Sequence, residues 1–386
     1  MRDQLPHDLV PERVQRSSTA PNPRSISSTG QQRPLPPGGV PLPPALDAEQ
    51  RFLDGPGPRV CLYLSTPEGV GGTRDATPLV LVHSVNAAAS AAELRPLFER
   101  YAAVRPVVAL DLPGFGQSER GPLDYSPAMM AEAILRTVQY LQGLGFRQPV
   151  DLMAVSLSAE FAARAAMAQP HWFHSVALVS PTGLDSVRLE PYAPERTKEK
   201  RVLRQVLESP LWTRALYSAL TSRASIRYFL KRTWGSMDID QQLLEYNVVS
   251  ACQPGARFAP LAFVSGALFT PGIANLYARL PQPVWISHGV RGDFTQYDAL
   301  SHMRSPETWV VDVFGTGALP YFEVPTLFAS RYEAFLRKVE ATRDVPQWRS
   351  RMARAALASP DVGTGTVRAE IKAACAKLRV LAAQGF

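Results

Sequence analysis

The chain has 386 residues, of which 46% are hydrophobic and 19% are charged, so most of it can bury a sizeable core. This composition excludes a largely disordered or fibrous protein. The net charge of +7 comes from the two ends, because residues 1–46 carry five basic and three acidic side chains and residues 341–386 carry eight and three. Residues 47–340 hold 28 of each sign, and a neutral body is evidence against a nucleic-acid-binding core.

Residues 1–46 contain ten of the 35 prolines and have little periodicity, which predicts a disordered, proline-rich arm. The arm begins with charged and polar residues, so a secretory signal is not expected. The three cysteines, Cys61, Cys252 and Cys375, are widely separated, which favours neither a disulfide framework nor a zinc site. No run of about 18 apolar residues is present, so no membrane span is expected. A reducing cytoplasm is the expected location.

From residue 59 onward, short β-rich runs alternate with helical ones. The run Leu79-Val80-Leu81-Val82 is apolar throughout, which is typical of a parallel strand covered on both faces. In chain order we expect strand 59–65, strand 78–83, helix 91–101, strand 106–110, helix 127–144, strand 150–154, helix 159–168 and strand 175–179. This alternation predicts an α/β fold with a mostly parallel, doubly wound sheet and right-handed crossovers.

Residues 184–281 interrupt the alternation with about five helical stretches and no clear strand, and they are too long for a plain crossover. An inserted helical cap is therefore expected. The alternation then resumes with strands 284–288 and 309–313, a helix near 324–338 and a further basic helix near 367–382. The predicted domains are an N-terminal arm at 1–46, an α/β core at 47–183 and 282–340, the cap at 184–281 and a basic helical tail at 341–386.

The most informative stretch is Asp151-Leu-Met-Ala-Val-Ser-Leu-Ser-Ala-Glu160, in which a buried strand runs into Ser156 and then into an alanine-rich helix. A serine at such a turn is held in a strained backbone conformation with its hydroxyl above the sheet. The turn requires small neighbours, and Ala154, Ser158 and Ala159 meet that need. An ordinary helix N-cap serine is the alternative interpretation.

Four motifs together resemble the α/β-hydrolase fold superfamily. The resemblance covers roughly residues 59–184 and 281–338. Its motifs are the strand Pro78–Val85, the turn Asp111-Leu-Pro-Gly-Phe-Gly-Gln-Ser118, the elbow Ala154-Val-Ser-Leu-Ser158 and the strand and loop Pro283-Val-Trp-Ile-Ser-His-Gly-Val-Arg-Gly-Asp293. The resemblance implies this superfamily's fold, with the inserted segment as its cap.

The same resemblance implies site residues. Ser156 would be the nucleophile, and the amides of Val85 and Leu157 would form the oxyanion hole. Asp293 would be the acid that orients a histidine, with Asp185 as a weaker substitute.

The histidine position departs from the family pattern Gly-His-x-Pro-x-x-Glu. The matching residues are Gly317-Ala318-Leu319-Pro320-Tyr321-Phe322-Glu323, so Ala318 stands where the histidine is expected. A serine hydroxyl without a base is a poor nucleophile. The candidate replacement bases are His302, His288 and His83.

Three functions remain open. The first is a serine hydrolase with a degenerate triad that acts on an ester or related carbonyl compound, a small and apolar molecule. The second is a lyase, cyclase or isomerase on the same fold, and the third is a catalytically silent binding or scaffold protein. The balance favours an enzyme. No cofactor or metal is expected, since there is no dinucleotide fingerprint, phosphate loop or metal-ligand cluster. The cap aromatics either pack a core or line an apolar site: Trp212, Tyr217, Tyr228, Phe229 and Trp234.

Overall fold

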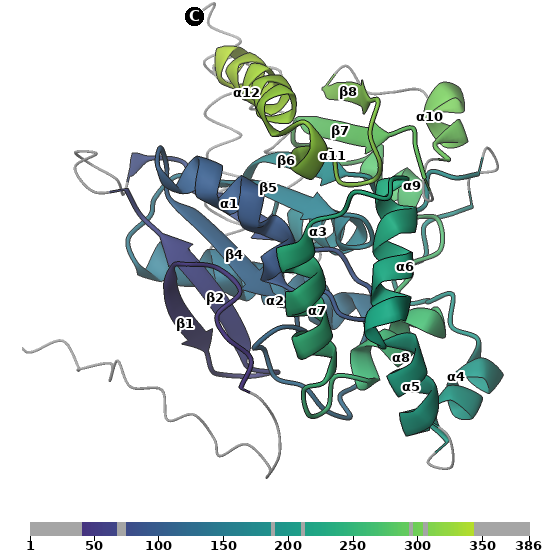
Figure 1. The fold of residues 1–386 in the computed structure, drawn as a ribbon. Helices are drawn as coiled ribbons and strands as arrows, with labels where there is room; N and C mark the ends of the chain where they lie inside the picture. The colour runs from purple at the N-terminus through teal and green to yellow at the C-terminus, as the bar shows by residue number, and fades with distance from the viewer. Residues whose placement is uncertain are drawn as a thin grey trace, which may run out of the picture. The chain divides into compact units, whose positions relative to one another are not determined.

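The computed structural model describes residues 41–67, 75–186, 190–209, 213–292, 296–303 and 308–342. Its centre is an eight-stranded sheet in the order β1-β2-β4-β3-β5-β6-β7-β8 (Figure 1). The strands are β1 (Glu49–Leu53), β2 (Val60–Ser65), β3 (Leu79–Val82), β4 (Val107–Asp111), β5 (Val150–Val155), β6 (Phe173–Val179), β7 (Val284–Gly289) and β8 (Trp309–Phe314). Strands β3 to β8 run parallel, whereas β1 and β2 pair antiparallel at one edge.

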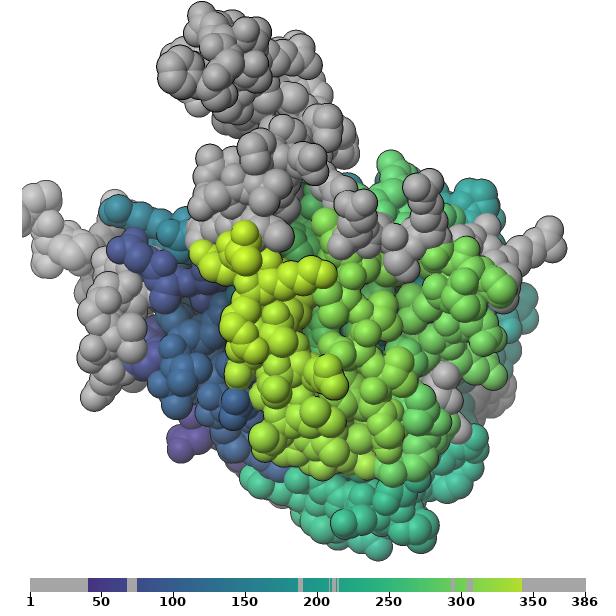
Figure 2. Space-filling model, turned by 90° about the horizontal axis from the view of Figure 1, so that it is seen from above, coloured from purple at the N-terminus to yellow at the C-terminus, as the bar shows by residue number. Residues whose placement is uncertain are grey.

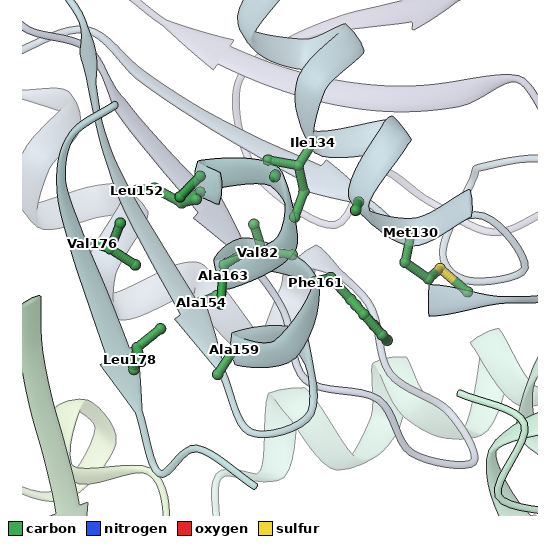
Figure 3. Close-up of a cluster of buried hydrophobic side chains, with 14 of the residues drawn as sticks. Val82, Met130, Ile134, Leu152, Ala154, Ala159, Phe161, Ala163, Val176 and Leu178 are labelled. Carbon is green, nitrogen blue, oxygen red and sulfur yellow. The ribbon is translucent and has the colours of Figure 1, made fainter. Parts of the chain in front are cut away.

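Helices cover both faces of this sheet because successive side chains of a buried strand point to opposite sides. Val80 and Val82 pack with α2 and α3 on one face (Figure 3), whereas Leu79 and Leu81 pack with α1 and α12 on the other. In Figure 2, α12 lies beside α1. These helices and the short ones that accompany the sheet are η2 (Ala91–Leu94), α1 (Arg95–Ala102), α2 (Pro127–Gly143), α3 (Ser158–Ala168), η3 (Pro170–Trp172), α10 (Asp298–His302), α11 (Pro320–Glu323) and α12 (Pro325–Thr342).

The predicted doubly wound, mostly parallel sheet is confirmed, and each expected strand corresponds to one of β2 to β8. Strand β1 was not predicted. Its sequence, Glu-Gln-Arg-Phe-Leu, lacks an apolar run because it lies at the sheet edge with no fully buried side chain. The sheet edge therefore begins within residues 47–183, closer to the arm than the apolar pattern indicated.

The described part of residues 184–281 forms six helices and no strand, and we call it the helical insertion. It contacts loops that follow the carboxyl ends of parallel strands. The Tyr217 hydroxyl donates to Ala87 O at 3.2 Å, and the Ala318 amide donates to Thr233 O at 2.9 Å. The insertion therefore lies over the carboxyl end of the sheet. Its helices are α4 (Arg201–Glu208), α5 (Thr213–Leu220), α6 (Arg223–Trp234), α7 (Gln241–Ala251), α8 (Phe258–Val264) and α9 (Ile273–Tyr277).

The last residues of the expected disordered arm pack on the core. Leu46 is only 4% exposed, and the Tyr246 hydroxyl donates to Pro43 O at 3.0 Å. The boundary expected at residue 46 was therefore placed too late, because the proline-rich composition continues into a segment that the core holds. Residues 1–40 and 343–386, with the predicted tail helix, lie outside the described residues.

Candidate active site

Ser156 occupies the turn between β5 and α3 with φ 57°, in the left-handed region that few non-glycine residues adopt. Its amide donates to Val179 O at 2.8 Å, which fixes the turn to the neighbouring strand. The side chain is partly exposed, whereas Val155 and Leu157 on either side are fully buried. The strained strand-to-helix turn predicted for this serine is present.

Small side chains allow the strand and the helix to meet at this turn. Ala154 and Ala159 are fully buried, and the Ser158 hydroxyl donates to His83 O at 2.5 Å. That bond joins the start of α3 to the end of β3. Ser158 therefore fixes the loop after β3 against the turn that carries Ser156.

The two predicted oxyanion amides belong to these joined segments. Val82 pairs with Ala154 in the parallel ladder, so the residues that follow β3 leave the sheet beside the Ser156 turn. Val85 and Leu157 are both buried, and among the described residues neither amide has a hydrogen-bond acceptor. Unpaired backbone amides of this kind are the donors that an oxyanion hole requires.

A buried carboxyl group that the sequence analysis missed supports the loop after β3. Glu93 is 4% exposed and accepts from the Ser84 hydroxyl at 2.7 Å and from the Ser84 amide at 3.4 Å. Asn86 Nδ2 donates to the same hydroxyl at 3.1 Å. Burial raises the pKa of Glu93 to about 7, although the bonds from Ser84 act in the opposite direction. The signal in the sequence was an isolated acid within the apolar run 87–94.

His83, one of the three candidate bases, is not available to Ser156. The ring is fully buried, its Nε2 accepts from the Leu112 amide at 3.0 Å and its Nδ1 lies 2.5 Å from Ser84 O. Burial lowers the pKa of His83 to about 4, so the ring is neutral and both nitrogens have partners. The proposal of His83 as a base is therefore corrected: its ring links the loop after β3 to the loop after β4.

His288 and His302 lie farther along the carboxyl end. His288 is 8% exposed, its Nδ1 lies 2.9 Å from Gly289 O, and its ring stacks on Tyr297 with centroids 4.0 Å apart. Burial lowers its pKa. His302 ends α10 with an exposed side chain. Among the described residues, no histidine is hydrogen-bonded to Ser156.

Of the two candidate acids, Asp293 and Asp185, the structure describes one. Asp293 lies outside the described residues. Asp185 is exposed and lies six residues past the end of β6. An exposed carboxylate at that distance from the strand end does not support the role of a triad acid.

Ala318 lies in the loop between β8 and α11, where the family histidine is expected. It is 6% exposed, its amide donates to Thr233 O of α6, and its carbonyl accepts from the Ser180 hydroxyl at 2.7 Å. Ser180 itself has φ 48°, the other positive φ among the described non-glycine residues. The loop is therefore packed between β6 and the helical insertion.

A metal centre is not apparent in the described part of the chain. Among those residues, no group of three or more His, Cys, Asp or Glu side chains could hold a metal ion. The chemistry that the described residues can offer is therefore a serine hydroxyl, two amides and a buried acid behind them.

Comparison with known proteins agrees with this arrangement. A model of the alpha/beta hydrolase fold family matches residues 77–236. The curated protein 1-acylglycerol-3-phosphate O-acyltransferase ABHD5 of Rattus norvegicus is 24% identical over 290 residues, which span 68% of this chain and 78% of that protein. The ABHD5 protein of Mus musculus matches to the same extent.

Solved structures show the same fold. A probable hydrolytic enzyme from Pseudomonas aeruginosa has a TM-score of 0.58 at 17% identity, covering 75% of this chain and 95% of that one. A thermophilic esterase from Thermogutta terrifontis has a TM-score of 0.56 at 18% identity, covering 76% and 99%. The sheet, the elbow and these matches define a protein with the α/β-hydrolase fold. Over residues 77–236, where the family model matches, the chain resembles the α/β-hydrolase fold superfamily.

Proposed function

We propose that the chain is a slow serine hydrolase whose nucleophile is Ser156 and whose substrate is a small, apolar ester or related carbonyl compound. The observation that carries the proposal is the positive φ of Ser156. Holding a non-glycine residue there costs of order 1–3 kcal/mol, and such strain is concentrated at functional sites. A helix-capping serine needs no such conformation, and Ser156 caps no helix because α3 begins at Ser158 without a side-chain cap.

In the proposed reaction the Ser156 hydroxyl oxygen attacks the carbonyl carbon, and the carbonyl oxygen takes up the negative charge between the amides of Val85 and Leu157. Collapse of this intermediate expels the alcohol and leaves an acyl-serine, which water then hydrolyses to the acid. The proton released by Ser156 must reach an acceptor and then the leaving alcohol. Asp293 is the proposed acid, and His288 or His302 would have to move to act as the acceptor.

Slow turnover follows from the site as it stands. A site that lacks one triad member keeps about 10³–10⁴-fold acceleration over water, which comes from the oxyanion hole and binding. The proposed rate therefore lies far below that of a complete triad. The relative's name describes an acyltransferase, and an acyl-serine can also be intercepted by an alcohol instead of water, so acyl transfer is a variant of the same proposal.

A fluorophosphonate probe tests the proposal because its phosphorus reacts with a nucleophilic serine. We expect slow labelling of the full chain, with the adduct on Ser156 by mass spectrometry and none in Ser156→Ala. Ser301→Ala, which changes an exposed serine of α10, is the matched control and should label like the parent. Absence of any adduct in the folded protein would instead support a catalytically silent binding protein.

We also propose a cellular compartment for the protein, on the basis of its cysteines. Cys61 and Cys252, the two cysteines of the described part, are both free thiols. Free thiols suit a reducing compartment, so we propose the cytoplasm.

A further inference from the structure

Ser156, Ser180 and His288 form one row across the carboxyl end of the sheet. Strands β5, β6 and β7 are neighbours (Figure 1), and their parallel ladders pair the last residue of β5 with Val179 and Val179 with Ser287. The Ser156 amide donates to Val179 O at 2.8 Å and the Ser180 amide donates to Ser287 O at 2.6 Å, so the register continues for one more residue. Neighbouring strands are about 4.8 Å apart, which puts the backbone of His288 about 10 Å from that of Ser156.

This row holds both of the strained residues, other than glycine, in the described part of the chain. Ser156 has φ 57° and Ser180 has φ 48°. The strand-to-helix turn accounts for the conformation of Ser156, whereas Ser180 leads from β6 into a loop. Backbone strain is concentrated at functional sites. The strain therefore marks the whole row, and not only the turn at Ser156, as part of the site.

The contacts of His288 determine which ring nitrogen carries the proton. Nδ1 lies 2.9 Å from Gly289 O, and a carbonyl oxygen can only accept, so Nδ1 is the protonated nitrogen of the neutral ring. Nε2 then carries the lone pair. It has no hydrogen-bond partner among the described residues and is not fully buried, so a water molecule can reach it. Burial lowers the pKa of His288 and keeps the ring neutral at pH 7, which is the state that a general base requires.

Tyr297 holds the imidazole on the side of Ser180. The rings of Tyr297 and His288 stack with centroids 4.0 Å apart, and the Tyr297 hydroxyl interacts with the Ser180 side chain. The Ser180 hydroxyl donates to Ala318 O at 2.7 Å, so it does not occupy Nε2 of His288. Burial raises the pKa of Tyr297 to about 12, and no described charged side chain shifts the pKa of His288. The imidazole is therefore the group of this cluster that can take up a proton near neutral pH.

We propose that His288 is the base of Ser156, that the Gly289 carbonyl stands in place of a triad acid, and that one water molecule carries the proton past Ser180. The inference rests on the proposed hydrolysis, because it names the proton acceptor that the reaction needs. With a bridging water, His288 can act from its observed position. Asp293 is then not required to orient the ring.

The proton moves in two balanced steps. As the Ser156 oxygen attacks the substrate carbonyl, its O–H bond breaks and the proton passes to the water, which gives one of its own protons to His288 Nε2. When the bond to the leaving alcohol breaks, the imidazolium returns a proton by the same path to the alcohol oxygen, and the ring is neutral again. A neutral carbonyl stabilises an imidazolium less than a carboxylate does, which agrees with slow turnover.

Fluorophosphonate labelling of Ser156 in the full chain, followed from pH 5 to 8, tests the assignment. The parent rate should fall on the acid side as His288 is protonated, with a midpoint below the ordinary pKa of 6.5 because burial lowers it. His288→Asn can still donate to Gly289 O but has no base, so its rate should fall at least about 100-fold and lose this pH dependence. His288→Ala should be equally slow and should recover when imidazole is added, which a purely structural role would not produce.

Two further variants complete the test. His171→Asn makes the same change at an exposed histidine near the amino end of the sheet and should label like the parent. His302→Asn removes the rival acceptor, and a larger loss there than in His288→Asn would overturn the assignment.

Three other results would also contradict it: an unchanged rate in His288→Asn, a parent rate that is flat from pH 5 to 8, or a His288→Ala rate that imidazole cannot raise. Melting temperatures verify folding, and the pH profile of the parent decides the matter if the His288 variants are unstable. Absence of any Ser156 adduct in the parent would overturn the proposed hydrolysis as well, whereas an adduct that the His288 variants keep would overturn this assignment alone.

Discussion

Polar side chains gather at both ends of the central sheet, and the two groups differ in how fully they are hydrogen-bonded. At the amino end, Asp151 accepts from Ser175 Oγ at 2.7 Å and Arg105 Nη2 at 2.5 Å, and it lies 3.0 Å from His174 Nδ1. Burial raises the pKa of Asp151, but the bond to His174 and the charge of Arg105 outweigh it and hold the pKa below its ordinary value. These hydrogen bonds and the ion pair link strand β5 to strand β6 and stabilise the fold.

At the carboxyl end of the sheet, the polar groups are less fully paired. Ser156 has a strained backbone and no histidine partner in the described chain, and Glu93 is a buried acid without a cationic partner. The amino end holds Asp, His and Ser together, yet Ser175 donates to the carboxylate rather than to the imidazole, so no base activates it. The comparison shows that backbone conformation and bond direction distinguish a candidate nucleophile, whereas residue composition does not.

The largest expected effect lies at the amino end. Asp151→Ala should lower the free energy of unfolding by about 3–5 kcal/mol, because it leaves the Arg105 guanidinium buried without a counter-charge. Urea unfolding at neutral pH measures the change. Glu333→Ala, which removes the carboxylate of the exposed Arg100 pair, should cost at most about 1 kcal/mol. Similar losses in the two variants would show that the buried ion pair of Asp151 contributes no more to stability than an exposed one.

The sequence predicted the sheet, the order of its elements and the elbow because each depends on local pattern. Apolar runs mark strands that are covered on both faces, and small residues around Ser156 mark the turn. It did not predict β1, whose edge position leaves no apolar run, nor the role of Glu93. The carboxyl group of Glu93 meets Ser84 only after the loop following β3 folds back, and no spacing rule encodes that contact. The contacts of His83 with Ser84 and Leu112 also form only when the chain folds, so the sequence did not predict them.

Glu93 should make the carboxyl end sensitive to pH. Its pKa is about 7 in the folded state and about 4.5 ordinarily, so the unfolded chain releases the proton first as pH rises. The acid therefore costs stability progressively between those values, and the cost of order 3 kcal/mol is complete above pH 7. Glu93→Gln should remove this cost, so the variant should gain on the parent as pH rises from 4.5 to 8.

Unfolding curves across that pH range measure the gain. Glu99→Gln, the same chemical change at an exposed position of α1, is the matched control. A constant difference for Glu93→Gln would mean that its carboxyl group is not held protonated. The change also removes little volume, so a uniform loss would indicate only a broken bond to Ser84.

Substitution by glycine should change the free energy of unfolding in opposite directions at the two ends of the sheet, by less than the changes above. Ser156→Gly relieves the positive φ, and we expect stability to rise by about 0.5–1 kcal/mol after the entropy cost of glycine. Ser175→Gly should lower stability by at least about 1 kcal/mol, because it removes a bond to Asp151 and loosens a regular strand. Thermal unfolding of both variants gives the comparison. A loss in Ser156→Gly would contradict the strained elbow.

The smallest expected effect is a gain of activity at the position of the missing histidine. If the loop keeps the family geometry, Ala318→His brings an imidazole to the Ser156 side of the sheet. Ala318 is 6% exposed and is bonded on both sides, to Thr233 and Ser180, so the new ring must displace its neighbours. A base placed about 1 Å from its best position loses much of its effect, so we expect a rise on the order of tenfold in hydrolysis of a small activated ester.

Two matched variants decide what such a rise means. Ala318→Gln introduces a side chain of similar length without a base and should give no gain. Adding Ser156→Ala to Ala318→His should abolish the gain, because the imidazole then has no hydroxyl to activate. A gain that persists without Ser156 would mean that the histidine acts alone. No gain in a variant that melts like the parent would remove the case for a latent triad, because the loop around Ala318 would then be fixed by α6 in a geometry that no imidazole can use.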